Sequence, residues 1–396
     1  MKFKLGLCAV ALAALAACGG GENSPPPPST TTTTRLIAFG DSLTDGGAYS
    51  RGNSLILQSQ AGVPKAAADL VGKFTNSPGE VWVEVLARRL GTTIAPERFE
   101  VGSASPVAAS NGANSAANAT NYAQGGARVA KVPGVGCNPN AAGACTAQAA
   151  VPLVTQIDRA LAKGNFNPTD LVVIWGGAND VFFNATLAGN DITAASVAAG
   201  RALTAAETQL IVAKYVIEME QAGLAAIAQV KRVKAAGAQR VVLMTIPNAA
   251  QTPFGVAGGA STQALLTALS GAYNAQIKRE VELMDPGVLL FDAGALASNW
   301  YGNPAANGFV NVQAPVCNVP AALGSSSSFC FVTAAPAGSA GNPFLRVLPA
   351  GVTPANSMFA DGVHPSVAAR EVRRRAARGP EGQGLGPMIA KAGVPP

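Results

Sequence analysis

A serine after a short apolar run and a histidine close to an aspartate are the residues of this chain best suited to nucleophilic chemistry. Ser42 follows the apolar residues 36–39, and the only histidine, His364, stands three residues after Asp361. A serine hydroxyl is a weak nucleophile until a base takes its proton, and a carboxylate that orients an imidazole base strengthens the arrangement. Near neutral pH, His364 is therefore the candidate base for Ser42, and Asp361 is its candidate partner.

Each of these short motifs also has a purely structural interpretation. A serine after Gly40-Asp41 could do no more than cap the next helix, and Asp361-Gly362 is a common turn sequence. A chemical role becomes the better interpretation only when further groups suited to the same reaction occur in a compatible order along the chain.

Two more motifs contain hydrogen-bond donors that could stabilise a developing negative charge. Acyl transfer places such a charge on the carbonyl oxygen, and each donor fixed around that oxygen contributes a few kcal/mol. Gly126 follows another glycine, so its backbone can approach a substrate closely, and the Asn179 side chain can donate where no backbone N–H reaches. We therefore expect Gly126 and Asn179 to donate to an oxyanion.

Ser42 and Asn179 both lie just beyond apolar runs of the kind found in buried strands. Such runs occur at residues 36–39, 171–175, 240–247 and 287–292. The sequence favours helices at residues 81–90, 153–163, 202–236 and 262–284, with weaker helical character at residues 54–72. Strands that alternate with helices predict an α/β fold, a three-layer sandwich with a parallel sheet, whose ligands bind at the carboxyl ends of the strands. Residues 293–353 have little periodicity and are expected to form a loop-rich flank that could line a substrate cleft.

The first 34 residues have the composition of a targeting segment and a stalk. Lys2 and Lys4 precede an apolar run at residues 5–14, which is short for a membrane span and typical of a secretory signal. The sequence Leu15-Ala16-Ala17-Cys18 resembles the bacterial lipoprotein signal, in which Cys18 would carry the lipid; an ordinary cleaved signal is the alternative. Residues 24–34 are rich in proline and threonine and are expected to stay extended.

These features predict a domain organisation and a location. We expect a signal peptide at residues 1–17, a lipid anchor and stalk at residues 18–34, and one folded domain at residues 35–369. The protein would then be a membrane-anchored lipoprotein of the bacterial cell envelope, in the outer membrane or facing the periplasm, or a secreted protein.

The formal charge of +6 is concentrated outside the expected folded domain. Lys2 and Lys4 lie in the signal, and residues 370–396 contain six basic and two acidic side chains. The domain itself is then close to neutral and offers no basic face, so we expect no nucleic-acid partner. Nothing in the sequence indicates a protein partner.

The four cysteines beyond the expected anchor form an even set in a chain predicted to be exported, which favours disulfides. Of the three possible connectivities we favour the two local pairs, Cys137 with Cys145 and Cys317 with Cys330. A zinc site is the rival interpretation, but the sequence has no Cys-x-x-Cys motif and only one histidine. We therefore expect no metal.

Four sequence blocks occur in the order found in one enzyme family. They are Gly40-Asp41-Ser42-Leu43, residues 121–128, Gly176-Gly177-Ala178-Asn179-Asp180 and Asp361-Gly362-Val363-His364. On these blocks the chain resembles the SGNH or GDSL hydrolases, and the resemblance spans residues 35 to about 366. Phe39 and Thr44-Asp45 look like the bacterial branch that contains lipases, lecithinases and haemolysins.

The resemblance implies a fold and a reaction. The fold is a flavodoxin-like α/β/α sandwich with loop insertions. In the reaction, Ser42 is the nucleophile, His364 is the base and Asp361 is its partner. The implied substrate is an acyl ester, either a small molecule or a lipid, cleaved without a cofactor by a carboxylic-ester hydrolase of the lipase or esterase type.

The resemblance also assigns the remaining groups of the site. The oxyanion hole would consist of the N–H groups of Ser42 and Gly126 and the side chain of Asn179, with Gly125 the less favoured donor. The neighbouring carboxylates of the blocks are expected to support them; these are Asp41, Asp45 and Asp180.

Two other functions stay open on the same sequence. An acyltransferase or a carbohydrate deacetylase could use the same three residues, and an inactive surface lipoprotein could bind lipid or glycan through the flank at residues 293–353. The sequence contains no Gly-x-Ser-x-Gly, P-loop or Gly-x-Gly-x-x-Gly motif, which disfavours an α/β-hydrolase elbow and a nucleotide site.

The C-terminal sequence departs from the family pattern. Relatives continue after the histidine with an apolar-periodic helix, whereas residues 370–396 are rich in arginine, glycine and proline. Such a segment cannot bury an apolar face, so we expect a mobile tail that gives the loop of Asp361 and His364 little support. A change of reading frame near Ala369 in the source sequence would produce this switch in composition.

Overall fold

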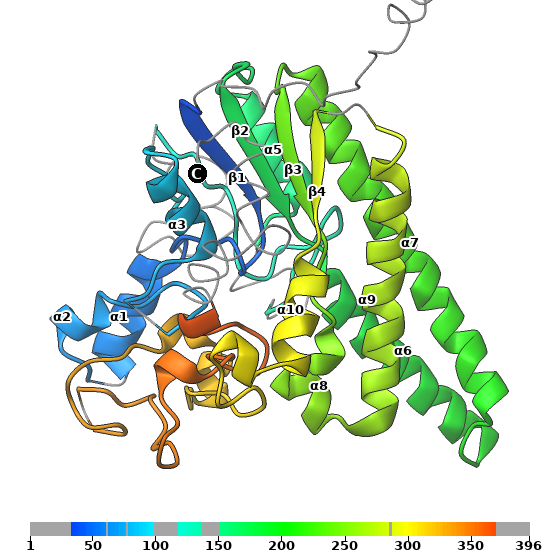
Figure 1. Cartoon of the computed structure of the whole chain (residues 1–396). Coiled ribbons are helices and arrows are strands. Elements are labelled where there is room, and N and C mark those ends of the chain that lie inside the picture. Colours follow the sequence, from blue (N-terminus) through cyan, green and yellow to red (C-terminus); the bar gives the residue numbers. More distant parts are fainter. Residues whose placement is uncertain are drawn as a thin grey trace, which may run out of the picture.

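Four parallel strands form the centre of the molecule. The computed structural model describes residues 33–369, except residues 61, 77, 99–117, 137–149, 285–286 and 340. The strands are β1 (Arg35–Gly40), β2 (Asp170–Trp175), β3 (Arg240–Met244) and β4 (Val288–Phe291), and they lie in the order β1-β2-β3-β4 (Figure 1). The predicted α/β class with a parallel sheet is confirmed.

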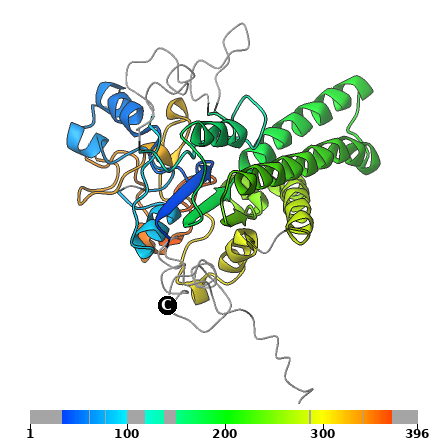
Figure 2. The same ribbon diagram turned by 90° about the horizontal axis from the view of Figure 1, so that it is seen from above.

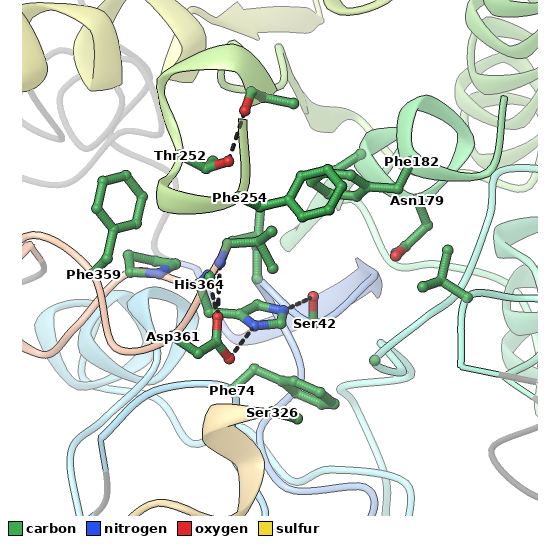
Figure 3. A pocket seen from close by; sticks show the side chains of 18 of the residues that line it. Ser42, Phe74, Asn179, Phe182, Thr252, Phe254, Ser326, Phe359, Asp361 and His364 are labelled. Atoms are coloured by element: carbon green, nitrogen blue, oxygen red, sulfur yellow. Dashed lines mark hydrogen bonds and ion pairs between the residues drawn. The ribbon is translucent and has the colours of Figure 1, made fainter. Parts of the chain in front are cut away.

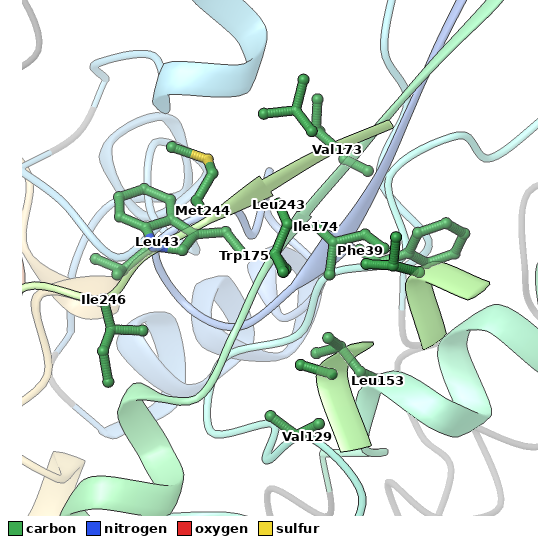
Figure 4. Close-up of a cluster of buried hydrophobic side chains, with 14 of the residues drawn as sticks. Phe39, Leu43, Val129, Leu153, Val173, Ile174, Trp175, Leu243, Met244 and Ile246 are labelled. Atoms are coloured by element: carbon green, nitrogen blue, oxygen red, sulfur yellow. The ribbon is translucent and has the colours of Figure 1, made fainter. Parts of the chain in front are cut away.

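The strands are continuously apolar because both faces of the sheet are covered. All six residues of β2 and five of the six residues of β1 are buried. Phe39 pairs with Ile174, and Ile174 pairs with Leu243, so that neighbouring strands contribute side chains to one cluster (Figure 4). Unbroken apolar runs are what a parallel sheet between two helical layers requires.

Helices cover the two faces of this sheet. The described helices are α1 (Ser50–Gln60), α2 (Lys65–Ala68), α3 (Trp82–Arg89), α5 (Leu153–Leu161), α6 (Ala178–Ala199), α7 (Ala205–Ala235), α8 (Pro253–Ala257), α9 (Gly259–Val281) and α10 (Ala293–Gly302), and some of them form these layers. Helices α5, α7 and α9 pack on β1, β3 and β4. Seen from above, α5 and α7 lie on one side of the sheet and α3 lies on the other (Figure 2), where Trp82 contacts Trp175 edge to face.

Short 3-10 turns complete the described elements. They are η1 (Ala249–Gln251), η2 (Ala305–Asn307), η3 (Ala321–Leu323), η4 (Ser327–Phe329) and η5 (Pro354–Asn356). Four of these five turns lie in the part of the chain beyond α10, so that region is loop-rich, as expected.

Sequence periodicity located most of the long helices and missed two. It did not predict α6, because several of the residues that α6 buries are polar, namely Asn179, Asp180 and Asn184. It also placed α10 inside the loop-rich flank, although Asp292 caps that helix by accepting a hydrogen bond from Ala295 N–H at 3.0 Å. An apolar pattern cannot reveal a helix whose buried face makes hydrogen bonds.

Residues 120–124 run along the free edge of β1. Ala38 N–H donates to Thr120 O at 2.8 Å, Tyr122 N–H donates to Ala38 O at 2.8 Å, and Gln124 N–H donates to Gly40 O at 3.1 Å. This segment therefore takes the place of a further strand beside β1 and delivers Gly125 and Gly126 to the carboxyl end of that strand.

The flank beyond α10 builds a second hydrophobic cluster against α1 and α2. Its buried members include Phe329, Phe331 and Leu57, and the disulfide between Cys317 and Cys330 lies inside it. The predicted pairing of these two cysteines is thus confirmed.

Several sequence predictions fall outside the described residues. They concern Cys18 and the stalk, the pair Cys137 and Cys145, and the tail at residues 370–396. Among the residues that the structure does describe, every helix is too short or too polar to cross a membrane.

Candidate active site

The turn after β1 brings Ser42 to the edge of the sheet. Gly40 must be a glycine, because a Cβ atom there would lie 2.3 Å from the carbonyl oxygen of Trp175. The buried side chain of Gln156 holds both backbone groups of Gly40, accepting from its N–H at 2.9 Å and donating to its carbonyl at 2.8 Å. With the last strand residue fixed in this way, Ser42 lies at the carboxyl end of the strand, where open α/β sheets bind ligands.

A loop 322 residues further along the chain brings His364 onto Ser42. His364 Nε2 lies 2.8 Å from Ser42 Oγ, and His364 Nδ1 lies 2.7 Å from Asp361 Oδ2. Figure 3 shows the three side chains in line, joined by dashed contacts. The structure therefore brings together the three residues that the sequence predicted as nucleophile, base and carboxylate, with spacing that permits proton transfer.

Asp361 is buried yet favours its ionised form. Burial alone would raise its pKa, but the charge and hydrogen bond of His364, together with backbone N–H groups of Val363 and Ser327, outweigh that effect and lower the pKa to about 2. The carboxylate therefore stays negative at any pH where an imidazole can act as a base, which suits it to hold a protonated His364.

A turn beside Ser42 presents a backbone N–H of the predicted kind. The carboxylate of Asp45 accepts from Gly125 N–H at 2.9 Å and also from Gly47 and Ala48 N–H. Within the described residues, the N–H groups of Gly126 and Ser42 make no hydrogen bond. Gly125 is thus committed to Asp45, whereas Gly126, at φ +86°, is available to a ligand.

Asn179 reaches the same region from the first turn of α6. Its Nδ2 donates to Ala127 O at 2.9 Å, which uses one of its two N–H bonds. The next residue, Asp180, pairs with Arg128 and accepts from Val129 N–H at 2.9 Å. These contacts join the blocks at residues 121–128 and 176–180 into one unit.

Burial raises the pKa of all three of the predicted supporting aspartates, Asp41, Asp45 and Asp180. Burial raises the pKa of Asp41 to about 7, with Leu43 N–H acting in the opposite direction. Burial likewise raises the pKa of Asp45 to about 6, although Ala48, Gly125 and Gly47 N–H groups favour its ionised form. Asp45 is therefore mainly ionised at neutral pH and can keep its three backbone donors, while Asp41 titrates close to neutrality.

A protein-family model matches most of the chain. The model of the GDSL-like lipase/acylhydrolase family matches residues 36–372. The chain belongs to this family. As a member of the GDSL-like lipase/acylhydrolase family the protein is a hydrolase, and the resemblance noted in the sequence is confirmed at that level.

This GDSL-family chain also has a similar protein among solved structures. That protein is an extracellular lipase from Streptomyces rimosus, with 16% identity over 87% of this chain and 99% of that chain and a TM-score of 0.37. The search of curated proteins gave no match.

A cavity of about 870 Å³ opens beside Ser42. Its wall is largely hydrophobic and comes from elements far apart in the sequence, among them Phe74, Phe182, Phe254 and Trp300. Phe182 and Phe254 meet edge to face with ring centroids 5.7 Å apart (Figure 3). Of the described residues that line the cavity, Asp361 and His364 are the two that can carry a charge, so the rest of the wall suits an uncharged group.

Metal ions require sets of ligands such as His, Cys, Asp and Glu side chains. No cluster of three or more of these side chains is found in the described part of the chain. The charged groups around Ser42 are all engaged with one another or with backbone N–H groups, as described above.

Sequence reasoning missed three residues that hold the site together. Gln156 fixes Gly40, Arg128 neutralises Asp180, and Ser327 donates from its backbone N–H to Asp361. Arg128 lies inside the block at residues 121–128, and this position could have indicated that it is buried and supports the site. Gln156 and Ser327 carry no local signal, because their roles depend on tertiary contacts.

Proposed function

We propose that the protein hydrolyses carboxylic esters of acyl groups, with Ser42 as nucleophile, His364 as general base and Asp361 as the carboxylate that orients the base. The observation that carries this proposal is the continuous path from Ser42 Oγ to His364 Nε2 at 2.8 Å and from His364 Nδ1 to Asp361 Oδ2 at 2.7 Å. Such a path lets the base remove a proton while the carboxylate stabilises the imidazolium that forms.

The reaction proceeds in two similar halves. Ser42 Oγ attacks the ester carbonyl as its proton moves to His364 Nε2, and the tetrahedral intermediate collapses when His364 returns that proton to the departing alcohol. The acyl group is then bonded to Ser42. Water, deprotonated by His364, attacks this second ester, and the carboxylic acid leaves as Ser42 Oγ regains its proton.

Three donors stabilise the oxyanion of both tetrahedral intermediates in this proposal. They are the N–H groups of Ser42 and Gly126 and the remaining N–H of the Asn179 side chain. One observation supports the choice of the two backbone donors. Gly125 N–H donates to Asp45 at 2.9 Å, whereas the N–H groups of Ser42 and Gly126 have no partner among the described residues. Donors fixed before the substrate arrives need no reorganisation during the reaction.

The lining of the cavity favours an apolar acyl group as the part of the substrate that is bound. Phe182, Phe254 and Trp300 present aromatic surface, and burial of each methylene of a chain against such a wall contributes about 0.8 kcal/mol. We therefore expect a lipase or esterase that prefers longer acyl chains to acetyl groups, with activity rising along a series of esters of graded chain length.

The signal at Leu15 to Cys18 supports a location at the cell envelope, held by a lipid on Cys18. In this proposal, Cys18→Ser abolishes lipid attachment and leaves unprocessed precursor or a soluble exported protein. A mature protein that begins downstream of Cys18 and carries no acyl chain would contradict the anchor and leave the proposed reaction untouched.

Ester hydrolysis by the purified protein and its variants tests the catalytic assignment. Ser42→Ala and His364→Ala should each remove nearly all activity, since residues that act as one unit lose their effect together. A fluorophosphonate probe should label the parent and leave Ser42→Ala unlabelled. An active His364→Ala enzyme would disprove the assignment, and a parent with no activity on any ester would favour a binding role instead.

A further inference from the structure

The carboxylate of Asp361 accepts four hydrogen bonds, and one of them comes from a distant loop. Its own loop supplies His364 Nδ1 at 2.7 Å, Val363 N–H at 2.9 Å and His364 N–H at 2.7 Å. The fourth donor is the backbone N–H of Ser327, 2.6 Å from Oδ2. Oδ2 is also the oxygen that contacts His364, so Ser327 bonds to the atom that must orient the base.

The donor to Asp361 is the backbone N–H of Ser327 and not its side chain. The hydroxyl of Ser327 is buried and makes no hydrogen bond within the described residues. Asp361 is only 4% exposed, so water has little access to replace a lost donor. An ionised group at such a depth depends on the protein for each of its hydrogen bonds.

The loop of Ser327 is anchored at two points. Ser328 O accepts from Gly72 N–H at 2.8 Å and from Asn53 Nδ2 at 3.2 Å, which ties the loop to the region of α1 and α2. Cys330 is joined by its disulfide to Cys317, whose N–H donates to Ala360 O at 2.9 Å, next to Asp361 in the chain.

We infer that the backbone N–H of Ser327 is a positioning group for the proposed ester hydrolysis, on which this inference rests. It keeps Asp361 ionised and fixes the direction of Oδ2, so that His364 Nδ1–H is held on Oδ2 and Nε2 faces Ser42. Positioning of this kind supports the chemical step, and it does so through Asp361, without contact with the substrate.

Replacement of the amide at position 327 by an ester removes the N–H and leaves the shape of the chain almost unchanged. The variant carries lactic acid at position 327 and is compared with Ser327→Ala, which has the same side chain and an ordinary amide. Since hydrogen bonds to charged groups are the stronger class, we expect kcat to fall about tenfold to a hundredfold. KM should be unchanged, because the N–H bonds to Asp361 and not to the cavity.

A matched ester elsewhere in the same flank controls for loss of a backbone hydrogen bond. Val352 N–H donates to Pro349 O at 3.0 Å in a turn that has no part in the site. Its α-hydroxy acid analogue at position 352 should leave kcat at the parent value. A fall in kcat equal to that at position 327 would overturn the inference, since any weakened loop would then have the same effect.

A double-mutant cycle with Asp361→Asn separates positioning from loop stability. If Ser327 acts through the carboxylate, the ester at position 327 should cost nothing further once that carboxylate is gone. The same fall in kcat in both backgrounds would overturn the inference, and so would an ester variant as active as Ser327→Ala. If the inference fails in either of these ways but Ser42→Ala is inactive, the proposed function still stands.

The unaltered protein provides a measurement that does not depend on folding of the ester variant. The Ser327 amide proton should be protected from hydrogen exchange in the parent, and it should exchange much faster in Asp361→Ala, where its acceptor is missing. Equal exchange rates in the two proteins would show that the hydrogen bond is not formed, and the inference would fail.

Discussion

Arg128 Nε donates to Asp180 Oδ1 at 3.1 Å in an ion pair whose side chains are 4% and 3% exposed. The pair joins the turn that carries Gly126 to the first turn of α6, which carries Asn179. The guanidinium also lies over the ring of Phe183, 4.1 Å from its centroid. Two proposed oxyanion donors from separate parts of the chain are thus held in a fixed relation by one buried charge pair.

Removal of Arg128 should be far more damaging than removal of an exposed arginine. Arg128→Met leaves the Asp180 charge buried and unpaired, which typically costs about 3–5 kcal/mol of unfolding free energy. Chemical denaturation measures this loss. Arg201→Met, which breaks an ion pair that is about half exposed, is the matched control and should change stability little.

Removal of both charges of this pair should be less harmful to stability than removal of Arg128 alone. Arg128→Met combined with Asp180→Asn removes both charges, so the double variant should be more stable than Arg128→Met alone. A double variant that is less stable than the single one would contradict the prediction that the unpaired charge of Asp180 is what destabilises Arg128→Met.

Asn179→Ala should reduce kcat with little effect on KM. Loss of one oxyanion donor typically lowers kcat by about 10²–10³. The control is Asn184→Ala in the next part of α6, where the side chain is buried and contacts Met219 Sδ at 3.3 Å, away from Ser42. Asn184→Ala should lower stability and retain kcat; steady-state kinetics with one ester substrate distinguishes the two. Parent-like kcat in Asn179→Ala would remove this residue from the oxyanion hole.

Asp41→Asn should alter how stability depends on pH. Burial raises the pKa of Asp41 from its ordinary value of 3.8 to about 7 in the folded protein. The folded state therefore binds this proton more tightly than the unfolded state does. The parent therefore loses stability as pH rises from about 4 to about 7, by up to about 1.4 kcal/mol per pH unit from this group.

Asparagine cannot lose a proton, so the variant escapes that loss. The stability of Asp41→Asn relative to the parent should rise with pH across this window and level off above it. Thermal or urea unfolding at a series of pH values measures the difference. A difference that is constant, or that falls with rising pH, would contradict the burial of a titrating carboxyl at position 41.

The disulfide between Cys317 and Cys330 should stabilise the flank. Replacement of both cysteines by alanine should cost roughly 2–3 kcal/mol, because the bond closes a short loop and restricts the unfolded chain. Peptide mapping without reductant should recover the pair intact from the parent. Free thiols at both positions in protein from its native compartment would contradict the bond.

The sequence predicted those parts of the site that are determined locally. Ser42 and Asn179 each follow a continuous apolar run, and such runs predict parallel strands that are covered on both faces and end at one edge of the sheet. His364 was identified by its being the only histidine. For these residues, residue type and position along the chain are enough to predict that they lie in one site.

The contacts that hold these residues depend on parts of the chain that no local pattern connects. Gln156 bonds to Gly40 across 116 residues, and Ser327 bonds to Asp361 from a segment without periodicity. Helix α6 was missed because it buries hydrogen-bonded side chains such as Asn184 where an apolar stripe was sought. Polar contacts in a core leave no periodic trace in the sequence, so they become visible only in three dimensions.

The separation of Ser42 and His364 by 322 residues has a consequence for biosynthesis. A ribosome completes the strand and turn of Ser42 tens of seconds before it adds His364, at ordinary elongation rates. During that interval the nascent chain carries the hydroxyl of the proposed nucleophile but no histidine, so it has no base to activate that hydroxyl. In the proposed mechanism the enzyme is therefore inert while it is being made, and it gains activity only when the loop of His364 closes on the turn after β1.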